Sequence, residues 1–389
     1  MTHVAYATDA ATSAKQHVRK LWRFLTIYGP GRTLFKVAGR LRLRPPTWPW
    51  RSRVADTGLI GCGQFGFSTI GYFLQRRFGA RIVACYDIDP AAAQSLARAL
   101  RVPHVCTSVD ELLSTPGLRR VYIASNHASH AGYACRALER GLDVYVEKPV
   151  AVAREQLVAL LRTRRRANGL LWAGYNRPFS AAMRWLRLHM PVHPEQGITL
   201  QCFVIGHQLA SSHWYRRPDE GTRVCGNMGH WLDLLVHVLS WRSLPDRLDI
   251  ALSWADDNEA DDNLAITIST DRHDLFGVTL TSRNEPFEGI RESIHMQHGE
   301  TTAEIEDFRR VTLWQGPRRQ RRHFWPKDVG HELAILQPFA ASVQRDWHEV
   351  ELSTLLMLHI TEMVRRRDRH SHLSLSACWA EIEHAVSPP

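Results

Sequence analysis

The chain has 389 residues, 44% of them apolar, and a formal net charge of +10, and its length exceeds what one hydrophobic core usually supports, so two domains are expected. Its seven cysteines are scattered without a C-x-x-C pair, which argues against a disulfide framework and against a metal site. No run of about 18 apolar residues and no secretion signal is found, so no membrane span is expected and a reducing cytoplasm is the expected location.

The positive charge belongs to a leader at the start of the chain. Eleven cations and no acid lie between Ala10 and Ala55, and without them and Asp9 the remaining residues 56–389 have a net charge of zero. The body is therefore neutral, and no nucleic-acid partner is expected. Aromatic and aliphatic residues interleave with the cations around Gly29-Pro30-Gly31, which predicts two short basic amphipathic helices within a leader of residues 1–53.

Three arrangements of these helices are open. They could rest on an anionic membrane surface, reach an acidic ligand, or pack their apolar face on the body of the protein. We expect packing, because Trp22, Phe24, Leu25, Leu34 and Phe35 supply apolar area that a neighbouring domain could bury. Peripheral membrane contact is the less favoured alternative.

A glycine-rich stretch follows the first apolar strand of the body. Gly61 suits a tight turn, Gly63 lets phosphates approach the backbone, and Gly66 lets the next helix lie close to the strand. A strand that turns sharply into a helix directs backbone N–H groups and the positive end of the helix dipole at one place. A second apolar run, 82–86, ends in Asp87, 21 residues beyond Gly66. This order predicts a dinucleotide site in which Asp87 binds the adenosine ribose, and it favours NAD over NADP because the carboxylate would repel a 2′-phosphate.

Residues 57–149 alternate between apolar strands and helices, the pattern of a parallel sheet with covering helices. Asp89-Pro90 and Ser108 are typical helix starts. Ser125 and Asn126 follow one strand, and Glu147-Lys148-Pro149 follows the next. Ligands bind at the carboxyl ends of such strands, so these side chains are expected at the crevice.

Beyond residue 175 the apolar period changes to two. Alternating segments at 198–204, 248–254, 264–268 and 276–280, with further strands at 293–296 and 311–314, predict a largely antiparallel sheet. The expected domains are a dinucleotide-binding domain at 54–175 and an α+β domain at 176–345. A helical segment is expected at 346–389.

The glycine motif, Asp87, Asn126-His127-Ala128-Ser129-His130 and above all Glu147-Lys148-Pro149 resemble the Gfo/Idh/MocA family of nicotinamide-dependent oxidoreductases, over about residues 54–345. The resemblance implies an α/β protein with an N-terminal Rossmann-type parallel sheet and a C-terminal domain with a large, mostly antiparallel open sheet. It implies a homo-oligomer that packs through that sheet. It also implies that Lys148 contacts the nicotinamide and the reacting hydroxyl. The implied cofactor-binding residues are Gly61, Gly63, Gln64, Phe65, Gly66, Asp87, Ser125, Asn126, His130, Glu147 and Lys148.

A second motif lies in the predicted helix around residue 230. Asp233 follows His230 by three residues, within reach of its ring, and a histidine held by a carboxylate can pass a proton near neutral pH. The resemblance extends to this H-x-x-D pattern and makes His230 the base. Asn227 stands where many family members have aspartate, so a hydrogen-bonding role is expected for it.

The resemblance implies hydride transfer between NAD and a secondary hydroxyl of a sugar, an inositol or a nucleotide-linked sugar. The residues expected on the substrate side are Tyr175, Asn176, Arg177, Trp214, Arg216 and Arg223. Two alternatives stay open. One is a glycosidase or lyase that recycles bound NAD, and the other is a non-catalytic scaffold that keeps the fold.

Overall fold

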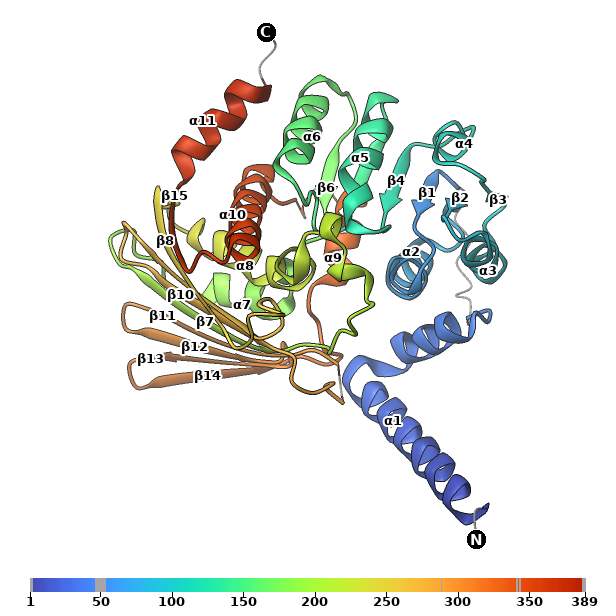
Figure 1. The fold of residues 1–389 in the computed structure, drawn as a ribbon, viewed down its shortest axis with the longest axis horizontal. Helices are drawn as coiled ribbons and strands as arrows, with labels where there is room; N and C mark the ends of the chain where they lie inside the picture. Colours follow the sequence, from blue (N-terminus) through green and yellow to red (C-terminus); the bar gives the residue numbers. More distant parts are fainter. Residues whose placement is uncertain (1–2, 46–53, 288, 341, 343, 387–389) are drawn as a thin grey trace.

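The computed structural model describes residues 3–45, 54–287, 289–340, 342 and 344–386, and for residues 3–15 and 17 it describes the backbone alone. The leader forms α1 (His3–Leu41), which is two helices joined at a kink, because Gly29 takes non-helical angles of φ 76° and ψ 169°. The two predicted helices are therefore present. The first projects away from the body and the second lies beside the parallel-sheet domain (Figure 1).

The parallel sheet has six strands in the order β3-β2-β1-β4-β5-β6. They are β1 (Thr57–Ile60), β2 (Ile82–Tyr86), β3 (His104–Val105), β4 (Arg120–Ile123), β5 (Asp143–Val146) and β6 (Leu171–Ala173), and every pair is parallel. The helices around it are α2 (Gly71–Phe78), α3 (Pro90–Leu100), α4 (Val109–Leu113), α5 (His130–Glu139) and α6 (Arg154–Arg166). This order is the Rossmann order, with its switch point between β1 and β4, where ligands bind in open α/β sheets.

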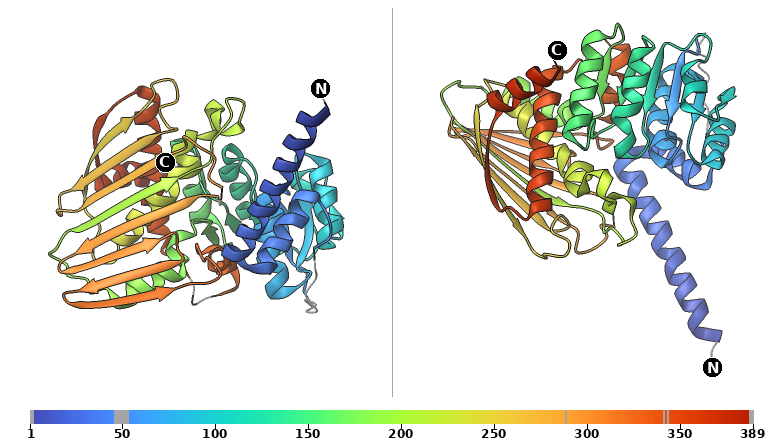
Figure 2. Two further views of the ribbon diagram at one scale, coloured as in Figure 1. Left: turned by 90° about the horizontal axis from the view of Figure 1, so that it is seen from below. Right: turned by 45° about the horizontal axis from the view of Figure 1, so that its top comes forward.

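The second sheet has nine strands in the order β14-β13-β12-β11-β7-β10-β9-β8-β15. They are β7 (Ile198–Ile205), β8 (Arg247–Trp254), β9 (Leu264–Thr270), β10 (Leu275–Thr281), β11 (Arg291–His298), β12 (Thr301–Glu306), β13 (Arg310–Gln315), β14 (Arg318–His323) and β15 (His370–Ser374). Strands β7 and β10 pair in parallel, and their other neighbours are antiparallel. Helices α7 (Ala181–His189), α8 (Gly229–Leu239) and α10 (Trp347–Arg366) cover one face (Figures 1 and 2). The predicted fold class is confirmed.

The last segment differs from the prediction. Residues 346–389 were expected to be helical, but after α10 the chain forms β15 at the edge of the second sheet, paired with β8, before α11 (Leu375–Val386). Strand β14 at the opposite edge was also not expected. It consists of Arg318, Arg319, Gln320, Arg321, Arg322 and His323. Charged side chains are a common means of protecting a sheet edge from further pairing, and they hide the apolar alternation of a strand.

The leader packs on the body through fewer residues than expected. Phe35 is fully buried, and its ring meets those of Phe67 and Tyr72 edge-on at 6.1 and 5.3 Å. Trp22 and Leu34, however, are 66% and 53% exposed, so the expectation that they pack on the body is wrong. Nowhere in the described ranges is there a helix with the length and apolar character needed to cross a membrane.

Candidate active site

The glycine turn after β1 has the geometry that the sequence predicts. Gly61 has a φ of +95°, and a Cβ there would lie 2.3 Å from the Ala124 carbonyl oxygen. A Cβ on Gly66 would lie 2.1 Å from the Gly61 oxygen, so both positions require glycine. A Cβ on Gly63 would meet no atom within 4 Å. The turn is thus packed against backbone at Gly61 and Gly66 and open at Gly63, so a diphosphate could approach it at Gly63.

Asp87 lies beside this turn at the end of β2. Its Oδ2 accepts from the Cys62 N–H at 2.6 Å, and its Oδ1 accepts from the Asp89 N–H at 2.9 Å. The leader also contacts the glycine turn, because Arg42 donates to the Cys62 carbonyl at 2.9 Å. The Gln64 amide donates to the Lys36 carbonyl at 3.3 Å.

Polar residues at the ends of β4 and β5 mainly hold the crevice loops. The Asn126 amide donates to Glu220 at 2.7 Å, and the Ser125 hydroxyl lies 2.7 Å from that of Ser129. The ring nitrogens of His130 lie 2.8 and 3.1 Å from the carbonyl oxygens of Pro149 and Ser125, and burial lowers the pKa of His130 to about 4. Because both nitrogens face backbone, His130 positions the loops rather than facing a ligand, which corrects its predicted place in direct cofactor contact.

Glu147 and Lys148 follow β5 in a buried environment. Tyr145 donates to the Glu147 carboxylate at 2.8 Å, and the Lys148 ammonium donates to the Gly226 carbonyl at 2.7 Å. Burial raises the pKa of Glu147, and burial lowers that of Lys148, with Arg177 lowering it further while Glu147 opposes the change. The lysine thereby links the parallel-sheet domain to the segment that begins α8.

His230 lies in the first turn of α8. Burial lowers the pKa of its ring well below the usual value, and Arg177 and Lys148 lower it further, so the ring is neutral near pH 7. Its Nδ1 is buried and has no hydrogen-bond partner among the described residues. The predicted contact with Asp233 is wrong. Both oxygens of Asp233 accept instead from Arg345 Nη1, at 2.6 and 2.7 Å.

Of residues 175–177, which come shortly after β6, one lies in the core and two line a cavity. Tyr175 is 1% exposed and its hydroxyl faces the Met357 sulfur, so its predicted place on the substrate side is wrong. Asn176 and Arg177 do line a cavity. Arg177 donates twice to Glu292, at 2.7 and 2.8 Å, and the Asn176 Oδ1 is buried without a partner among the described residues.

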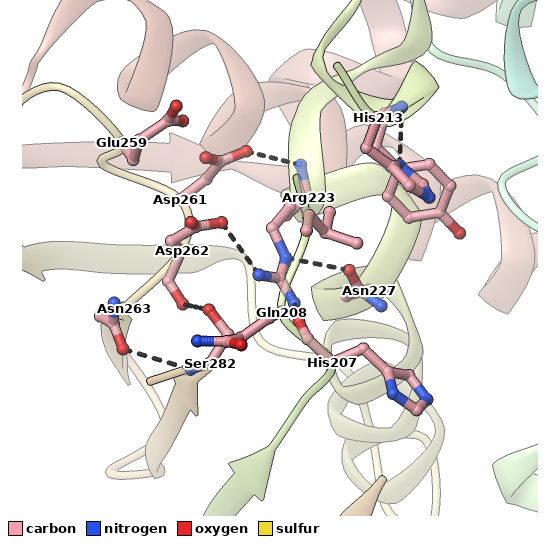
Figure 3. A network of polar contacts seen from close by, with 12 residues as sticks. His207, Gln208, His213, Arg223, Asn227, Glu259, Asp261, Asp262, Asn263 and Ser282 are labelled. Carbon is pink, nitrogen blue, oxygen red and sulfur yellow. Dashed lines mark hydrogen bonds and ion pairs between the residues drawn. The ribbon is translucent and has the colours of Figure 1, made fainter. Parts of the chain in front are cut away.

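The arginines expected to contact the substrate are held by acids instead. Arg223 is 1% exposed and donates to Asp262 at 2.9 Å and to Asn227 Oδ1 at 3.2 Å, as Figure 3 shows. Arg216 binds Asp262 at 2.8 Å and also Glu259. Neither guanidinium is free for a ligand, so both predictions are corrected. Asn227 does take a hydrogen-bonding role, as the acceptor for Arg223.

Trp214 is partly exposed and lies on the parallel-sheet side of this region. Its ring meets that of His127 at 4.6 Å. Burial lowers the pKa of His127 well below its usual value, and Lys148 lowers it further, so the pair lies close to Lys148.

Some of these site residues line a cavity of about 530 Å³. Its lining contains His230, Asn176 and Arg177, but Lys148 and Trp214 are outside it. Two further contributors to the lining were not among the predicted site residues. His331, which begins α9 (His331–Leu336), lies against Phe65 with ring centroids 5.8 Å apart. The other contributor is the leader, whose lining residues are Lys20, Leu21, Phe24, Tyr28, Thr33, Lys36, Val37 and Arg40.

Comparison with known proteins also indicates a dinucleotide-binding domain in the first part of the body. Residues 55–175 match the model of the Gfo/Idh/MocA family, described as an oxidoreductase family with an NAD-binding Rossmann fold. An inositol 2-dehydrogenase of Ralstonia nicotianae is 29% identical over 190 residues, covering 47% of this chain and 53% of that protein. The chain thus spans about half the length of this relative. A 2,7-anhydro-N-acetylneuraminate hydratase of Mediterraneibacter gnavus is 30% identical over 129 residues, covering 33% of each.

A solved structure extends the likeness of fold beyond the matched residues. The structure of a putative myo-inositol dehydrogenase from Sinorhizobium meliloti has a TM-score of 0.66 and 17% identity, covering 83% of this chain and all of that one. The family match confirms the expected cofactor, NAD. Residues 55–175 are thus similar to the NAD-binding Rossmann domain of the Gfo/Idh/MocA family of oxidoreductases.

Proposed function

We propose that this protein is an NAD-dependent oxidoreductase that transfers a hydride between the cofactor and a secondary hydroxyl of a sugar, an inositol or a nucleotide-linked sugar. One observation carries the proposal. Two buried polar atoms without partners among the described residues, His230 Nδ1 and Asn176 Oδ1, belong to residues that line one cavity, next to a family-matched dinucleotide domain. Buried polar groups are rarely left unpaired, so a polar ligand is the natural partner of these atoms.

The residues present fit the cofactor. The open front of Gly63 and the backbone N–H groups of the turn would hold its diphosphate, and Asp87 would hold its adenosine ribose. When bound, NAD supplies the carbon that accepts or gives the hydride. Asp87 would favour NAD over NADP, because its carboxylate would repel a 2′-phosphate.

Two side chains would act on the reacting hydroxyl. Oxidation of the carbinol releases a proton from the hydroxyl and leaves developing negative charge on its oxygen. His230, neutral because burial lowers its pKa, would take that proton. Lys148, whose charge acts on the His230 ring, would stabilise the oxyanion and relay the proton. In the reverse direction the same groups would return the proton to the carbonyl oxygen.

Other residues would position these groups. Arg177, which is held by its ion pair with Glu292, would place a positive charge at the cavity wall. Asp233 would act through Arg345, tying α8 to the segment before α10, and would thus fix the helix that carries His230. Arg223 and Asn227 would hold the segment between β7 and α8 in the same manner.

A second candidate is a lyase-type reaction in which NAD is reduced and reoxidised within one turnover. The similarity to the hydratase of Mediterraneibacter gnavus favours it. The two candidates differ in one observable. A dehydrogenase accumulates reduced cofactor with a ketone product, whereas a lyase forms product while the cofactor stays oxidised.

The test is turnover of a panel of sugars, inositols and nucleotide sugars with NAD, followed by cofactor absorbance and product mass. The proposal expects reduced cofactor with at least one substrate class. It expects His230→Ala to lower the rate about 10²–10⁴-fold, while His295→Ala, an exposed histidine on β11, leaves the rate unchanged. A protein that binds NAD but converts no member of the panel is the result expected of a scaffold.

The predicted homo-oligomer and the cytoplasmic location stay predictions. Helices cover one face of the nine-stranded sheet, and Phe203 on β7 is 50% exposed. We expect a second subunit to cover this region. Light scattering coupled to size-exclusion chromatography tests it, and a monomer at micromolar concentration would contradict it.

A further inference from the structure

The leader forms one wall of the cavity that contains His230. Three of its cations, Lys20, Lys36 and Arg40, are among the lining residues, as are Phe24 and Tyr28, whose rings stack with centroids 4.3 Å apart. Lys20 and Lys36 are partly buried. The kink at Gly29 makes this possible, because the first helix supplies Lys20 and the second supplies Lys36 and Arg40. Residues from both sides of the kink thereby share the cavity with His230.

These three cations have no acidic partner among the described residues, unlike the other charges of the cavity. Glu285 is paired with His207 at 2.8 Å, and Glu292 is paired with Arg177. Lys36 instead lies 3.9 Å from the centre of the Phe24 ring. The lining contains five cations, Lys20, Lys36, Arg40, Arg177 and Lys327, against two acids, Glu285 and Glu292, so its excess charge is positive.

Without a bound anion, the spacing of these cations destabilises the second leader helix through repulsion between like charges. Arg32, Lys36 and Arg40 recur every four residues on one helix, and like charges at that spacing destabilise a helix. Burial and, after it, the charges of Arg40, Arg32 and Lys20 together lower the pKa of Lys36 to about 8. Arg32 is occupied, since it donates to the Ser68 carbonyl at 3.3 Å. An anion between Lys20, Lys36 and Arg40 would remove this repulsion.

We propose that Lys20, Lys36 and Arg40 bind a phosphoryl group of the substrate, so that the leader selects a phosphorylated or diphosphate-linked sugar over a neutral one. This inference rests on the proposed function and deepens it. Phosphoryl oxygens accept charge-assisted hydrogen bonds from ammonium and guanidinium groups. The cavity volume of about 530 Å³ lies within the usual 300–1,000 Å³ range of ligand sites, so it has room for a sugar with such a group.

The first test uses a probe that needs no sugar. Inorganic pyrophosphate is titrated calorimetrically into the full-length protein saturated with NAD, so that the glycine turn is already occupied. Lys36→Gln and Arg40→Gln should each weaken pyrophosphate binding about tenfold, the size of a lost charge-assisted hydrogen bond. Arg19→Gln is the matched control, because Arg19 is an exposed leader cation outside the cavity lining, and it should leave the affinity unchanged. Thermal unfolding of each variant verifies that it is folded.

Absence of pyrophosphate binding, or equal loss in all three variants, would overturn the inference, since equal loss indicates diffuse attraction to a basic helix. The second test compares KM for myo-inositol and myo-inositol 1-phosphate. We expect a preference of at least tenfold for the phosphorylated compound, reduced in Lys36→Gln. If the protein oxidises neutral polyols and Lys36→Gln changes nothing, this inference fails while the proposed function stands. If NAD does not bind, the proposed function itself fails.

Discussion

Replacing Asp233 with asparagine separates the two roles that a carboxylate after His230 could have. In the structure Asp233 is fully buried, with two contacts of 2.6 and 2.7 Å to Arg345 and one of 3.0 Å to the Ser353 hydroxyl. Removing one partner of a buried ion pair costs about 3–5 kcal/mol, because the other charge remains buried. Arg345 retains Glu349 at 3.0 Å, so we expect the lower end, about 3 kcal/mol.

The assay is the free energy of unfolding in urea for the wild type, Asp233→Asn and a matched control. The control is Asp249→Asn, which breaks the exposed Arg247–Asp249 pair, with side chains 60% and 46% exposed, and should cost less than about 1 kcal/mol. The reasoning is refuted if Asp233→Asn leaves stability unchanged and instead shifts the pH dependence of turnover. That result would mean that the carboxylate orients His230 during catalysis.

Four further outcomes are expected. Gly63→Ala should keep the fold and weaken NAD binding, because its Cβ meets no protein atom, whereas Gly66→Ala should lower thermal stability, because its Cβ would lie 2.1 Å from the Gly61 oxygen; equal stability of the two variants in a melting experiment would contradict this. Asp87→Ala should weaken NAD binding more than NADP binding, and calorimetry showing equal losses would remove Asp87 from its proposed role. Lys148→Ala should abolish turnover with NAD still bound, and more than about a tenth of the wild-type rate would be too much for a group that acts on the reacting oxygen. Since burial lowers the pKa of His230 well below 6.5, protonation should remove the base only at pH values below 6.5, so an acid limb of kcat/KM at or above 6.5 that His230→Gln abolishes would contradict the assignment.

The parallel-sheet domain could be predicted from the sequence because its signals are local. Asp89 caps α3 by accepting from the Ala91 N–H, and the Ser108 hydroxyl caps α4 by accepting from Glu111, both where the residue types predict helix starts. The apolar run 82–86 coincides with β2. In the second domain, β7 alternates between buried and exposed positions as its sequence does. Strand β14 could not be predicted, because its charged residues carry no apolar period.

The site was predicted only in part because its contacts join distant parts of the chain. Helical spacing places Asp233 near His230 in sequence, but its partner Arg345 lies 112 residues away and competes successfully for the carboxylate. Arg216 and Arg223 likewise form ion pairs with Glu259 and Asp262, and no local sequence pattern links these acids to the arginines. The leader carried a clear charge signal, and its position in the cavity wall depended on the kink at Gly29 and on tertiary packing.

The most direct measurement of the central claim follows one deuterium atom. A substrate from the active class of the panel, deuterated at the reacting carbon, is incubated with NAD and the full-length protein, and the cofactor and product are analysed by mass spectrometry. Hydride transfer predicts reduced cofactor that carries the deuterium, in equal amount to a ketone product, and no transfer with Lys148→Ala. Product that forms while the cofactor remains oxidised and unlabelled would contradict a dehydrogenase and indicate internal recycling of NAD.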